Sequence, residues 1–239
     1  MILIEKVKTC GWDAALRGMR NPKDSWEKAD SIYGEFYGLE NGHEIIVPFE
    51  SPEMGENDLK LALTLANAGQ VHGKFLRMIH VSMDITAPLY WWKEMDTYKV
   101  GTVANSCSTM HRIHAKEFTL DQFSTEHLID HTWSEADNFS GTTPSDILKE
   151  TIRMLNKCRE KYLYRMKNND PARAKMFWWQ LIQLLPSSYN QKRTWDADYA
   201  VLKNIYEYRR DHKLDEWHTF CNMIEQLPYP RLITGGNKE

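Results

Sequence analysis

Apolar and polar residues follow two different periods along this chain. Residues 57–69 carry a broad apolar face at helical spacing, which predicts a helix that Asn57 caps and a glycine ends. Residues 75–85 alternate well enough to predict a sheet strand, which the pair Ala87-Pro88 ends. Because proline suits the first turn of a helix, we expect a helix to follow directly.

Helical patterns dominate the second half of the chain. The sequence Thr-Pro-Ser-Asp from Thr143 is a strong start signal for a long helix. Asp170-Pro171 starts another helix. Apolar residues at helical spacing predict two more helices, over residues 196–213 and 214–228.

A hairpin is predicted near residues 36–48. Asn41-Gly42 supplies the positive-φ pair of a tight turn between two β-prone runs. The flanks are acidic and contain glycine, so we expect residues 29–57 to form a mobile excursion that acts as a lid. Because helices and strands mix along the chain, we expect one α+β domain over residues 1–239.

Composition narrows the classes of function. The chain of 239 residues has a formal net charge of -3, which removes the electrostatic argument for nucleic-acid binding but leaves a single nucleotide as a ligand. No run approaches the roughly 20 apolar residues that span a bilayer, so we expect no membrane partner and a cytoplasmic location. The four cysteines lie far apart without a CxxC pair, so we expect no metal site and no disulfide framework.

Residues 86–111 form the stretch with the richest chemistry. They combine an aromatic pair, Lys99 and many small hydroxyl and amide side chains between two apolar runs. A core helix would continue the apolar period, and a surface loop would carry more glycine, proline and charge. Neutral hydrogen-bonding groups beside aromatic surface suit flat, polar-edged ligands such as flavins and nucleotide bases.

Several motifs keep the order and the spacing of a known family. His72 and an Ala-Pro pair precede a triplet and a run of hydroxyl and amide residues. The matched positions are Thr97, Tyr98, Lys99, Thr102, Asn105, Ser108, Met110 and His111. Together with the late pair Leu185-Pro186, they resemble the motifs of the flavin-dependent thymidylate synthases, the ThyX family, over roughly residues 57–227.

The resemblance implies both a fold and an assembly. The fold would be a ThyX-like α+β fold, with a central sheet flanked by long helices and the hairpin near residues 36–48 projecting from it. The assembly would be a homotetramer in which sites are shared between subunits.

The resemblance also implies cofactor-binding residues. The corresponding positions are His72, Thr97, Tyr98, Lys99, Asn105, Asp198 and Asn204. On a continuous helix His212 would share a face with Asp198 and Arg209, so it joins this group. Lys99 keeps one positive charge of the family's Arg-His-Arg triplet, for flavin phosphates or substrate, as a point charge rather than a bidentate fork.

Substrate and catalytic positions follow in the same way. Arg209 stands at the family's catalytic arginine, which orients and polarises the uracil ring, and a fixed guanidinium is suited to stabilising charge on pyrimidine oxygens. Glu94 replaces a substrate-contacting glutamine, and Ser108 and His111 lie at or beside nucleotide-contacting positions.

The family reaction implies the cofactors and the substrate. It takes a methylene group from methylenetetrahydrofolate and a hydride from reduced FAD, with NADPH as the earlier reductant, and converts dUMP into dTMP. It uses no cysteine nucleophile. The protein's main tasks would be to stack the flavin, folate and uracil in order and to stabilise developing charge.

Two departures keep other functions open. Met110 stands where the family's arginine holds the nucleotide phosphate, while His111, Arg112 and His114 offer substitute cations nearby. Glu94 could accept a hydrogen bond from an amino group and so favour cytosine. A retuned pyrimidine-nucleotide methylase or hydroxymethylase, or a catalytically inactive nucleotide-binding protein, are therefore alternatives.

Each of these features also has a purely structural interpretation. His72 before a strand is compatible with a structural histidine, and one tryptophan of each pair, 91–92 and 178–179, is expected in the core or a subunit interface. Cys107 is expected to be a buried, inert thiol rather than a nucleophile. Arg209 and its neighbour could simply be solvated at a helix C-terminus.

Overall fold

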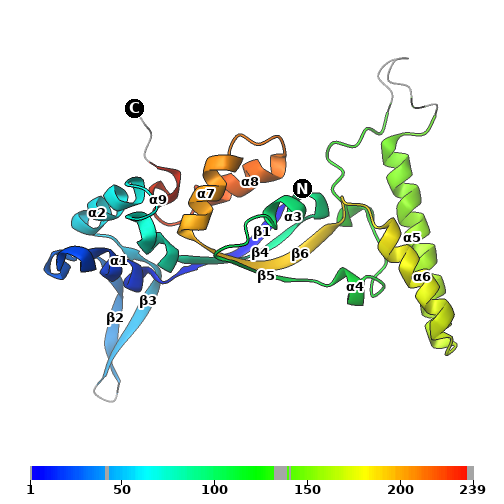
Figure 1. Ribbon diagram of the computed structural model, residues 1–239. Coiled ribbons are helices and arrows are strands. Elements are labelled where there is room, and N and C mark those ends of the chain that lie inside the picture. Colours follow the sequence, from blue (N-terminus) through cyan, green and yellow to red (C-terminus); the bar gives the residue numbers. More distant parts are fainter. Residues whose placement is uncertain (1, 41–42, 132–138, 140, 236–239) are drawn as a thin grey trace. The chain divides into compact units, whose positions relative to one another are not determined.

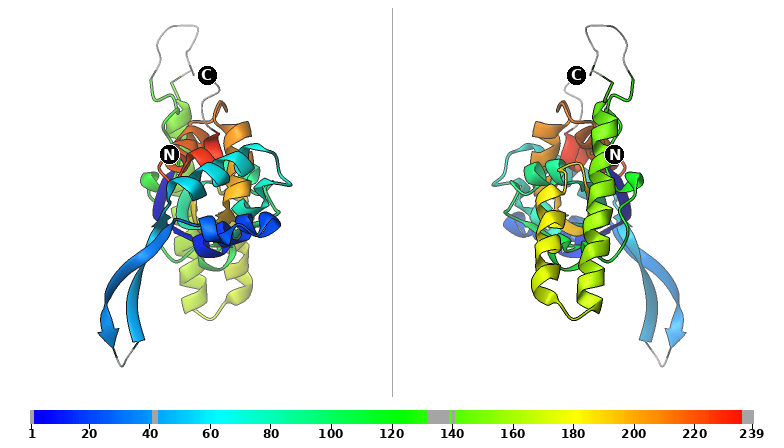
Figure 2. Two further views of the ribbon diagram at one scale, coloured as in Figure 1. Left: turned by 90° about the vertical axis from the view of Figure 1, so that its left-hand side faces the viewer. Right: turned by 90° about the vertical axis from the view of Figure 1, so that its right-hand side faces the viewer.

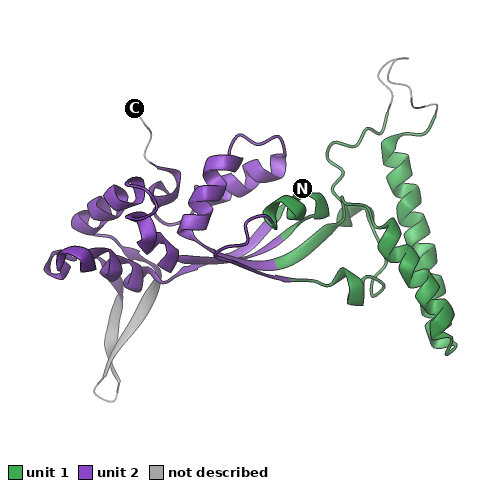
Figure 3. Ribbon diagram, viewed as in Figure 1, with its two compact units in different colours: residues 1–3, 86–96, 106–193 green, residues 4–85, 97–105, 194–239 purple. Residues whose placement is uncertain are grey.

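The computed structural model describes residues 2–40, 43–131, 139 and 141–235, and the side chains of residues 35–49 are outside this description (Figure 1). The chain divides into two compact units, which Figure 3 colours separately. Unit 1 comprises residues 1–3, 86–96 and 106–193, and unit 2 comprises residues 4–85, 97–105 and 194–239. The single domain over residues 1–239 stays a prediction.

A four-stranded sheet combines strands from the beginning, the middle and the end of the chain. Its strands lie in the order β1 (Leu3–Cys10), β4 (His80–Pro88), β6 (Asn190–Asp198) and β5 (Thr102–Ser106). Along β4 burial alternates, because Val81, Met83 and Ile85 are buried while the residues between them are partly exposed. One face of this strand therefore packs against the core.

The predicted strand over residues 75–85 is wrong in its first part. Gly73–Met78 forms a 3₁₀ helix (η3), and β4 begins only after it. Phe75 and Leu76 are neighbours and both are buried, whereas successive residues of a strand point to opposite faces. The predicted end at the Ala-Pro pair is confirmed, and so is the following helix, α3 (Leu89–Met95).

Unit 2 packs its helices around aromatic side chains. Its α-helices are α1 (Trp12–Arg20), α2 (Glu56–Asn67), α7 (Tyr199–Arg209), α8 (Asp215–Ile224) and α9 (Arg231–Thr234). Short 3₁₀ turns also occur at η1 (Asn21–Lys23) and η2 (Trp26–Lys28). The buried rings of Trp12 and Tyr199 meet edge to face with their centroids 5.2 Å apart. Such contacts add to the free energy gained by burying the rings.

The hairpin of unit 2 lies where the sequence predicts it. Its strands are β2 (Ile32–Glu40) and β3 (His43–Glu53), and they pair antiparallel. The predicted strands near residues 36–48 are thus confirmed, while the predicted Asn41-Gly42 turn lies outside the described residues. The mobility of residues 29–57 and their role as a lid stay predictions.

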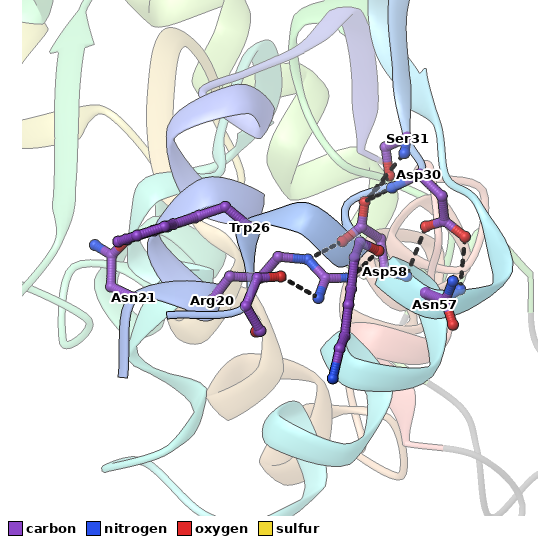
Figure 4. A network of polar contacts seen from close by, with 9 residues as sticks. Arg20, Asn21, Trp26, Asp30, Ser31, Asn57 and Asp58 are labelled. Carbon is purple, nitrogen blue, oxygen red and sulfur yellow. Dashed lines mark hydrogen bonds and ion pairs between the residues drawn. The ribbon is translucent and has the colours of Figure 1, made fainter. Parts of the chain in front are cut away.

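A buried ion pair anchors the segment that leads into β2 (Figure 4). Arg20 Nε lies 2.7 Å from Asp58 Oδ1, and both side chains are almost completely buried. Arg20 also donates hydrogen bonds to the carbonyl oxygens of Ser25 and Lys28. The second oxygen of Asp58 accepts three hydrogen bonds, from the Ser31 hydroxyl and from two backbone N–H groups. These bonds offset the free energy lost when both charges leave water.

Helix α2 is capped from a distance. Gly55 occupies the N-cap position, and the Asp30 carboxylate accepts hydrogen bonds from the N–H groups of Asn57 and Asp58, both at 2.9 Å. The prediction that Asn57 caps this helix is therefore wrong, because Asp30, from the loop before β2, satisfies the free N–H groups. The hydrogen bond from Asn57 is the main cause that lowers the pKa of Asp30.

In unit 1, α5 (Pro144–Lys167) and α6 (Pro171–Leu184) pack side by side (Figure 2). Both predicted starts are confirmed, since Thr143 and Asp146 form a capping box and Asp170 accepts a hydrogen bond from the N–H of Arg173. The shared core contains Phe118, Phe123, Leu148, Ile152, Leu155, Cys158 and Leu181. None of the described helices combines the length and apolar character needed to cross a bilayer.

The tryptophan pair 91–92 differs from the expectation that one member of each pair lies in the core or a subunit interface. Trp91 and Trp92 are both buried, and Trp92 Nε1 donates a hydrogen bond to the carbonyl of Gln191. Helix α3 is thus covered on more than one side, so neighbours that point to different faces are both enclosed. Trp178 is half-buried, whereas Trp179 is 43% exposed.

The predicted helix over residues 196–213 is too long at both ends. Asp198 ends β6 and is the N-cap of α7, and α7 ends at Arg209. Burial alternates in the preceding strand, where Trp195 and the second residue after it are buried. His212 lies beyond the helix, so the predicted helical face shared by Asp198, Arg209 and His212 is wrong.

Candidate active site

The loop that precedes β5 is held against α7 of unit 2 through Tyr98 and Arg209. Arg209 Nε donates a hydrogen bond to Tyr98 Oη at 2.9 Å. Its guanidinium carbon lies 4.7 Å from the ring centroid of Trp217 and 5.6 Å from that of Tyr98. A half-buried cation between two aromatic rings gains electrostatic stabilisation and loses rotational freedom. Arg209 is therefore a positioned cation rather than a freely solvated end of the helix.

The same loop meets the other end of α7 at Gly101. Asp198 is 7% exposed, and its carboxylate accepts the N–H of Val201 at 2.8 Å as the N-cap. Gly101 has φ +76°, and a Cβ there would lie 3.0 Å from both Asp198 Oδ2 and Val201 Cγ2. Within the loop, the Thr102 hydroxyl donates to the Tyr98 carbonyl at 2.6 Å. Only glycine allows this backbone geometry and this close approach without strain.

A cavity of about 540 Å³ opens beside this loop within unit 2. Its wall contains Gly69, Gly73 and Gly101, together with Asp198 and Asn204 from the beginning and the middle of α7. Volumes of this order are typical of small-molecule sites. Because glycines leave backbone rather than side chains on the surface, the wall suits close approach by a flat ligand.

Charges of both signs line this cavity. Arg77 and Lys203 contribute cations, and Glu207 contributes a carboxylate in addition to Asp198. Lys203 Nζ donates to the carbonyl of Ala66 at 2.6 Å. Burial lowers the pKa of Lys203, and Glu207 partly opposes that shift. The amine is therefore held inside the wall rather than extended into water.

The remaining predicted cofactor residues of unit 2 lie outside this wall. His72 is exposed, precedes η3 and bonds through its N–H to the Gly69 carbonyl. Thr97, Lys99 and Asn105 are exposed. His212 Nδ1 accepts the N–H of Leu214 at 3.2 Å in the turn before α8. Asp198 and Asn204 line the cavity, and the ligand roles of the whole set stay predictions.

Unit 1 holds the predicted substrate residues other than Arg209. Glu94 lies half-buried on α3, and Ser108 caps α4 (Thr109–Arg112) by accepting the N–H of His111 at 3.1 Å. His111 is exposed. Met110 is 46% exposed, and its carbonyl accepts the Trp178 indole N–H at 3.1 Å. Ser108 and His111 are thus brought together, and their contact with a substrate stays a prediction.

Some residues of the cavity carry no sequence signal of their own. Arg77, Lys203 and Glu207 look like ordinary surface charges in the sequence, and only the fold brings them to one wall. Gly101 has a signal in the sequence, because a glycine two residues after the triplet Thr97-Tyr98-Lys99 marks a backbone position that a side chain would strain.

The cysteines take no visible part in this arrangement. Cys107 is exposed on unit 1, so the prediction that this thiol is buried is wrong. Cys158 and Cys221 are buried; burial raises the pKa of Cys158 and, with nearby carboxylates, raises that of Cys221 to about 11. Both buried thiols are therefore protonated and poor nucleophiles at neutral pH. Among the described residues, no three His, Cys, Asp or Glu side chains are grouped to hold a metal ion.

Comparisons with known proteins show which fold this is. No protein-family model and no curated protein match the sequence. Solved structures do match, and they place the chain in the fold of ThyX-type nucleotide methylases, which confirms the predicted ThyX-like α+β fold.

Two of these structures illustrate the likeness. One is ThyX of Helicobacter pylori with FAD and dUMP, with a TM-score of 0.60, 15% identity and 100% of each chain covered. Another is the UMP/dUMP methylase PolB of Streptomyces cacaoi bound with 5-Br dUMP, with a TM-score of 0.54, 13% identity and coverage of 95% of this chain and 89% of that one. At these identities the likeness concerns the fold.

Proposed function

We propose that this protein is a flavin-dependent enzyme that methylates dUMP to dTMP. The observation that carries the proposal is the hydrogen bond from Arg209 to Tyr98, because it joins the matched arginine to the matched triplet beside a cavity. Two proteins with the same fold bind the corresponding ligands, FAD with dUMP in one case and 5-Br dUMP in the other. FAD is the proposed cofactor, and NADPH and methylenetetrahydrofolate are the proposed cosubstrates.

The cavity of unit 2 fits part of a flavin. Its glycines allow a flat ring to approach the backbone, and Asn204 can bond through its side-chain amide. Arg77 offers a cation for a phosphate group. His72 and Lys99 are exposed, and each directly precedes in the sequence a residue that lines the cavity. Their proposed contacts with the flavin would be made from these positions. A bound FAD would supply hydride chemistry that no side chain can provide.

The chain's own residues would orient the substrate and stabilise charge. Tyr98 and Trp217 fix the Arg209 guanidinium before any ligand binds, so little reorganisation is needed when charge develops on a pyrimidine oxygen. Asp198 keeps the start of α7 in place through its N-cap bond. As the family resemblance implies, we propose that the active protein is a homotetramer that works in the cytoplasm.

The test is flavin binding followed by turnover. The purified chain, with FAD added, should acquire flavin absorbance, and with dUMP, methylenetetrahydrofolate and NADPH it should form dTMP. Arg209→Lys keeps the positive charge but loses the planar guanidinium, which can donate two parallel hydrogen bonds. We therefore expect kcat to fall about 100-fold. Arg210→Lys is the control, since that neighbour is exposed and does not bond to Tyr98. No flavin binding under oxidising and reducing conditions would reject the proposal.

A second function has one specific observation in its favour. Glu94 puts a carboxylate where an amide is expected, and a related fold belongs to a methylase of both UMP and dUMP. A carboxylate at that position favours a base with an amino group. Turnover of dCMP or UMP in preference to dUMP would support a retuned pyrimidine-nucleotide methylase or hydroxymethylase, and exclusive dTMP formation would eliminate it. Binding of nucleotides without turnover would point to an inactive nucleotide-binding protein.

A further inference from the structure

Positive charge is concentrated in one part of unit 1. Residues 157–175, which run from the second half of α5 into α6, contain seven lysines and arginines and two acidic residues. The whole chain, in contrast, has 30 Lys and Arg against 33 Asp and Glu. The formal net charge of -3 conceals this local excess of cations, so the chain-wide value does not exclude a polyanionic partner here.

The arginines of this stretch are largely engaged within unit 1. Arg165 and Arg173 both reach the carboxylate of Asp170, at 3.4 and 3.5 Å. Arg159 Nε donates a hydrogen bond to the carbonyl oxygen of His114 at 2.9 Å. The lysines of the stretch are different, because they are exposed and pair with no carboxylate among the described residues; they are Lys157, Lys161, Lys167 and Lys175. Their charge can therefore be neutralised by an external partner.

Three of these lysines belong to the outer face of α5. Lys157, Lys161 and Tyr164 follow one another at spacings of four and three residues, which places them on one face of the helix. Lys167 follows after another three residues, so the stripe covers about 15 Å of helix. The core residues Leu155 and Cys158 lie on the opposite side of α5. The stripe therefore points away from the core that α5 shares with α6.

A groove of about 250 Å³ between α5 and α6 adjoins this stripe, and we call it the Tyr164 groove. Its lining residues are Glu160, Lys161, Tyr164, Arg165 and Phe177. Lys161 Nζ lies 5.9 Å from the ring centroid of Phe177, and the guanidinium carbon of Arg165 lies 5.8 Å from that of Tyr164. Tyr164 is 61% exposed, and Glu160 is the only acid among the described lining residues. Aromatic rings thus alternate with cations at the surface.

This alternation matches the chemistry of single-stranded nucleic acid. Lysines neutralise backbone phosphates and release the counterions that surround them. Unpaired bases stack on aromatic side chains, whatever the base. An anionic membrane or an acidic protein would also meet the lysines, but only unpaired bases combine regularly spaced anions with flat rings that fit Tyr164. In a duplex the bases already stack on one another, so the exposed ring would gain less.

We propose that the paired helices α5 and α6 bind single-stranded nucleic acid, with phosphates at Lys157, Lys161 and Lys167 and a base in the Tyr164 groove. Binding would be salt-dependent and without sequence preference, because phosphate contacts and stacking carry little sequence information. This role goes beyond the proposed methylation and does not depend on it. All of the residues involved belong to unit 1, and none of them is assigned to the flavin or to the nucleotide substrate.

The test is the fluorescence anisotropy of a labelled oligothymidylate of about 20 nucleotides, titrated with the purified chain at increasing NaCl. The logarithm of the affinity should fall with the logarithm of the salt concentration with a slope of about -2, because each of the three phosphate contacts contributes roughly -0.7 on a single strand. Lys157→Gln combined with Lys161→Gln should weaken binding about tenfold at low salt and reduce the slope to about -0.7.

A double variant of unit 2 is the matched control. Lys23→Gln combined with Lys60→Gln removes the same two charges from exposed positions and should leave the affinity and the slope unchanged. Equal affinities in the two double variants, or no binding by the parent at low salt, would overturn the proposal.

The exposed tyrosines provide a second comparison, which separates stacking from charge. Tyr164→Ala should weaken oligothymidylate binding about tenfold and leave the salt slope unchanged, because a stacking surface is lost and no charge is removed. Tyr208→Ala, at an exposed tyrosine of α7, should change neither. Unchanged affinity in Tyr164→Ala would overturn the placement of a base in the Tyr164 groove.

Vesicles of phosphatidylcholine and phosphatidylglycerol test the competing partner. We expect the parent to bind oligothymidylate more tightly than a duplex of the same length, and its oligothymidylate affinity to depend on Lys157 and Lys161. Vesicle binding that depends on these two lysines, without oligothymidylate binding, would assign the surface to a membrane and overturn the proposal.

Discussion

Arg209 and Tyr98, which are 111 residues apart in the sequence, share a hydrogen bond of 2.9 Å in unit 2. Both side chains are held in place, because Arg209 also stacks on Trp217 and Tyr98 also packs edge-on against that ring at 6.2 Å. A cation held in this way is ready to meet developing negative charge. The loop before β5 and the C-terminal end of α7 therefore act as one structure.

Tyr98→Phe tests this pairing directly. The ring remains for the cation–π contact, but the hydroxyl that holds Arg209 is lost. We expect a small loss of stability, about 1 kcal/mol, and a fall of roughly tenfold in kcat, because the guanidinium is less well oriented. Tyr208→Phe, at an exposed site on α7 next to Arg209, is the control. Steady-state turnover and urea denaturation measure the two effects, and unchanged kcat in Tyr98→Phe would contradict the role given to the bond.

Gly101→Ala tests the close approach of the loop to α7. The new Cβ would meet Asp198 Oδ2 and Val201 Cγ2 at 3.0 Å, in addition to the cost of a positive φ. Gly141 has nearly the same φ, +85°, but a Cβ added there would have no atom within 4 Å. Gly141→Ala therefore isolates the free energy lost by placing a side chain at a positive φ, about 1 kcal/mol. We expect Gly101→Ala to have the lower melting temperature and to bind FAD more weakly. Equal melting temperatures for the two variants would show that the contact is not important.

Arg20 and Arg17 offer a comparison of buried and exposed ion pairs on one helix. Arg20→Met leaves Asp58 as a buried charge that has lost its main partner and should cost about 3–5 kcal/mol. Arg17→Met breaks an exposed pair with Asp13 and should cost about 0–1 kcal/mol. Free energies of unfolding from urea titrations check both. Similar losses in the two variants would mean that the Arg20–Asp58 pair is less important to the fold than its burial indicates.

The sequence predicts local structure of this protein better than its long-range pairings. The starts of α5 and α6 were found because Thr143 and Asp170 act on N–H groups within the next three residues. The cap of α2 was assigned wrongly, because Asp30 reaches it from 27 residues away. Strands β1, β5 and β6 were not predicted, since a strand is stabilised by partners that are distant in sequence.

The candidate site shows the same division. Family spacing pointed to Asp198, Asn204 and Arg209, and the first two line one cavity. The bond between Tyr98 and Arg209 could not be predicted, because it depends on how the loop before β5 packs on α7. The helix predicted over residues 196–213 begins later than expected, because β6 continues to Asp198. It also ends before His212, because the chain turns after Arg209.

Asp30→Asn tests the remote cap of α2 through its pH dependence. Hydrogen bonds from the N–H groups of Asn57 and Asp58 lower the pKa of Asp30 below its usual 3.8. Its contribution to stability is therefore fully present above pH 3.8 and is lost as the pH falls through the lower pKa of the folded state. We expect the parent to melt at a higher temperature than Asp30→Asn at neutral pH, and the difference to shrink in acid as the protonated carboxyl comes to resemble an amide. A difference between the parent and Asp30→Asn that persists unchanged in acid would contradict the cap.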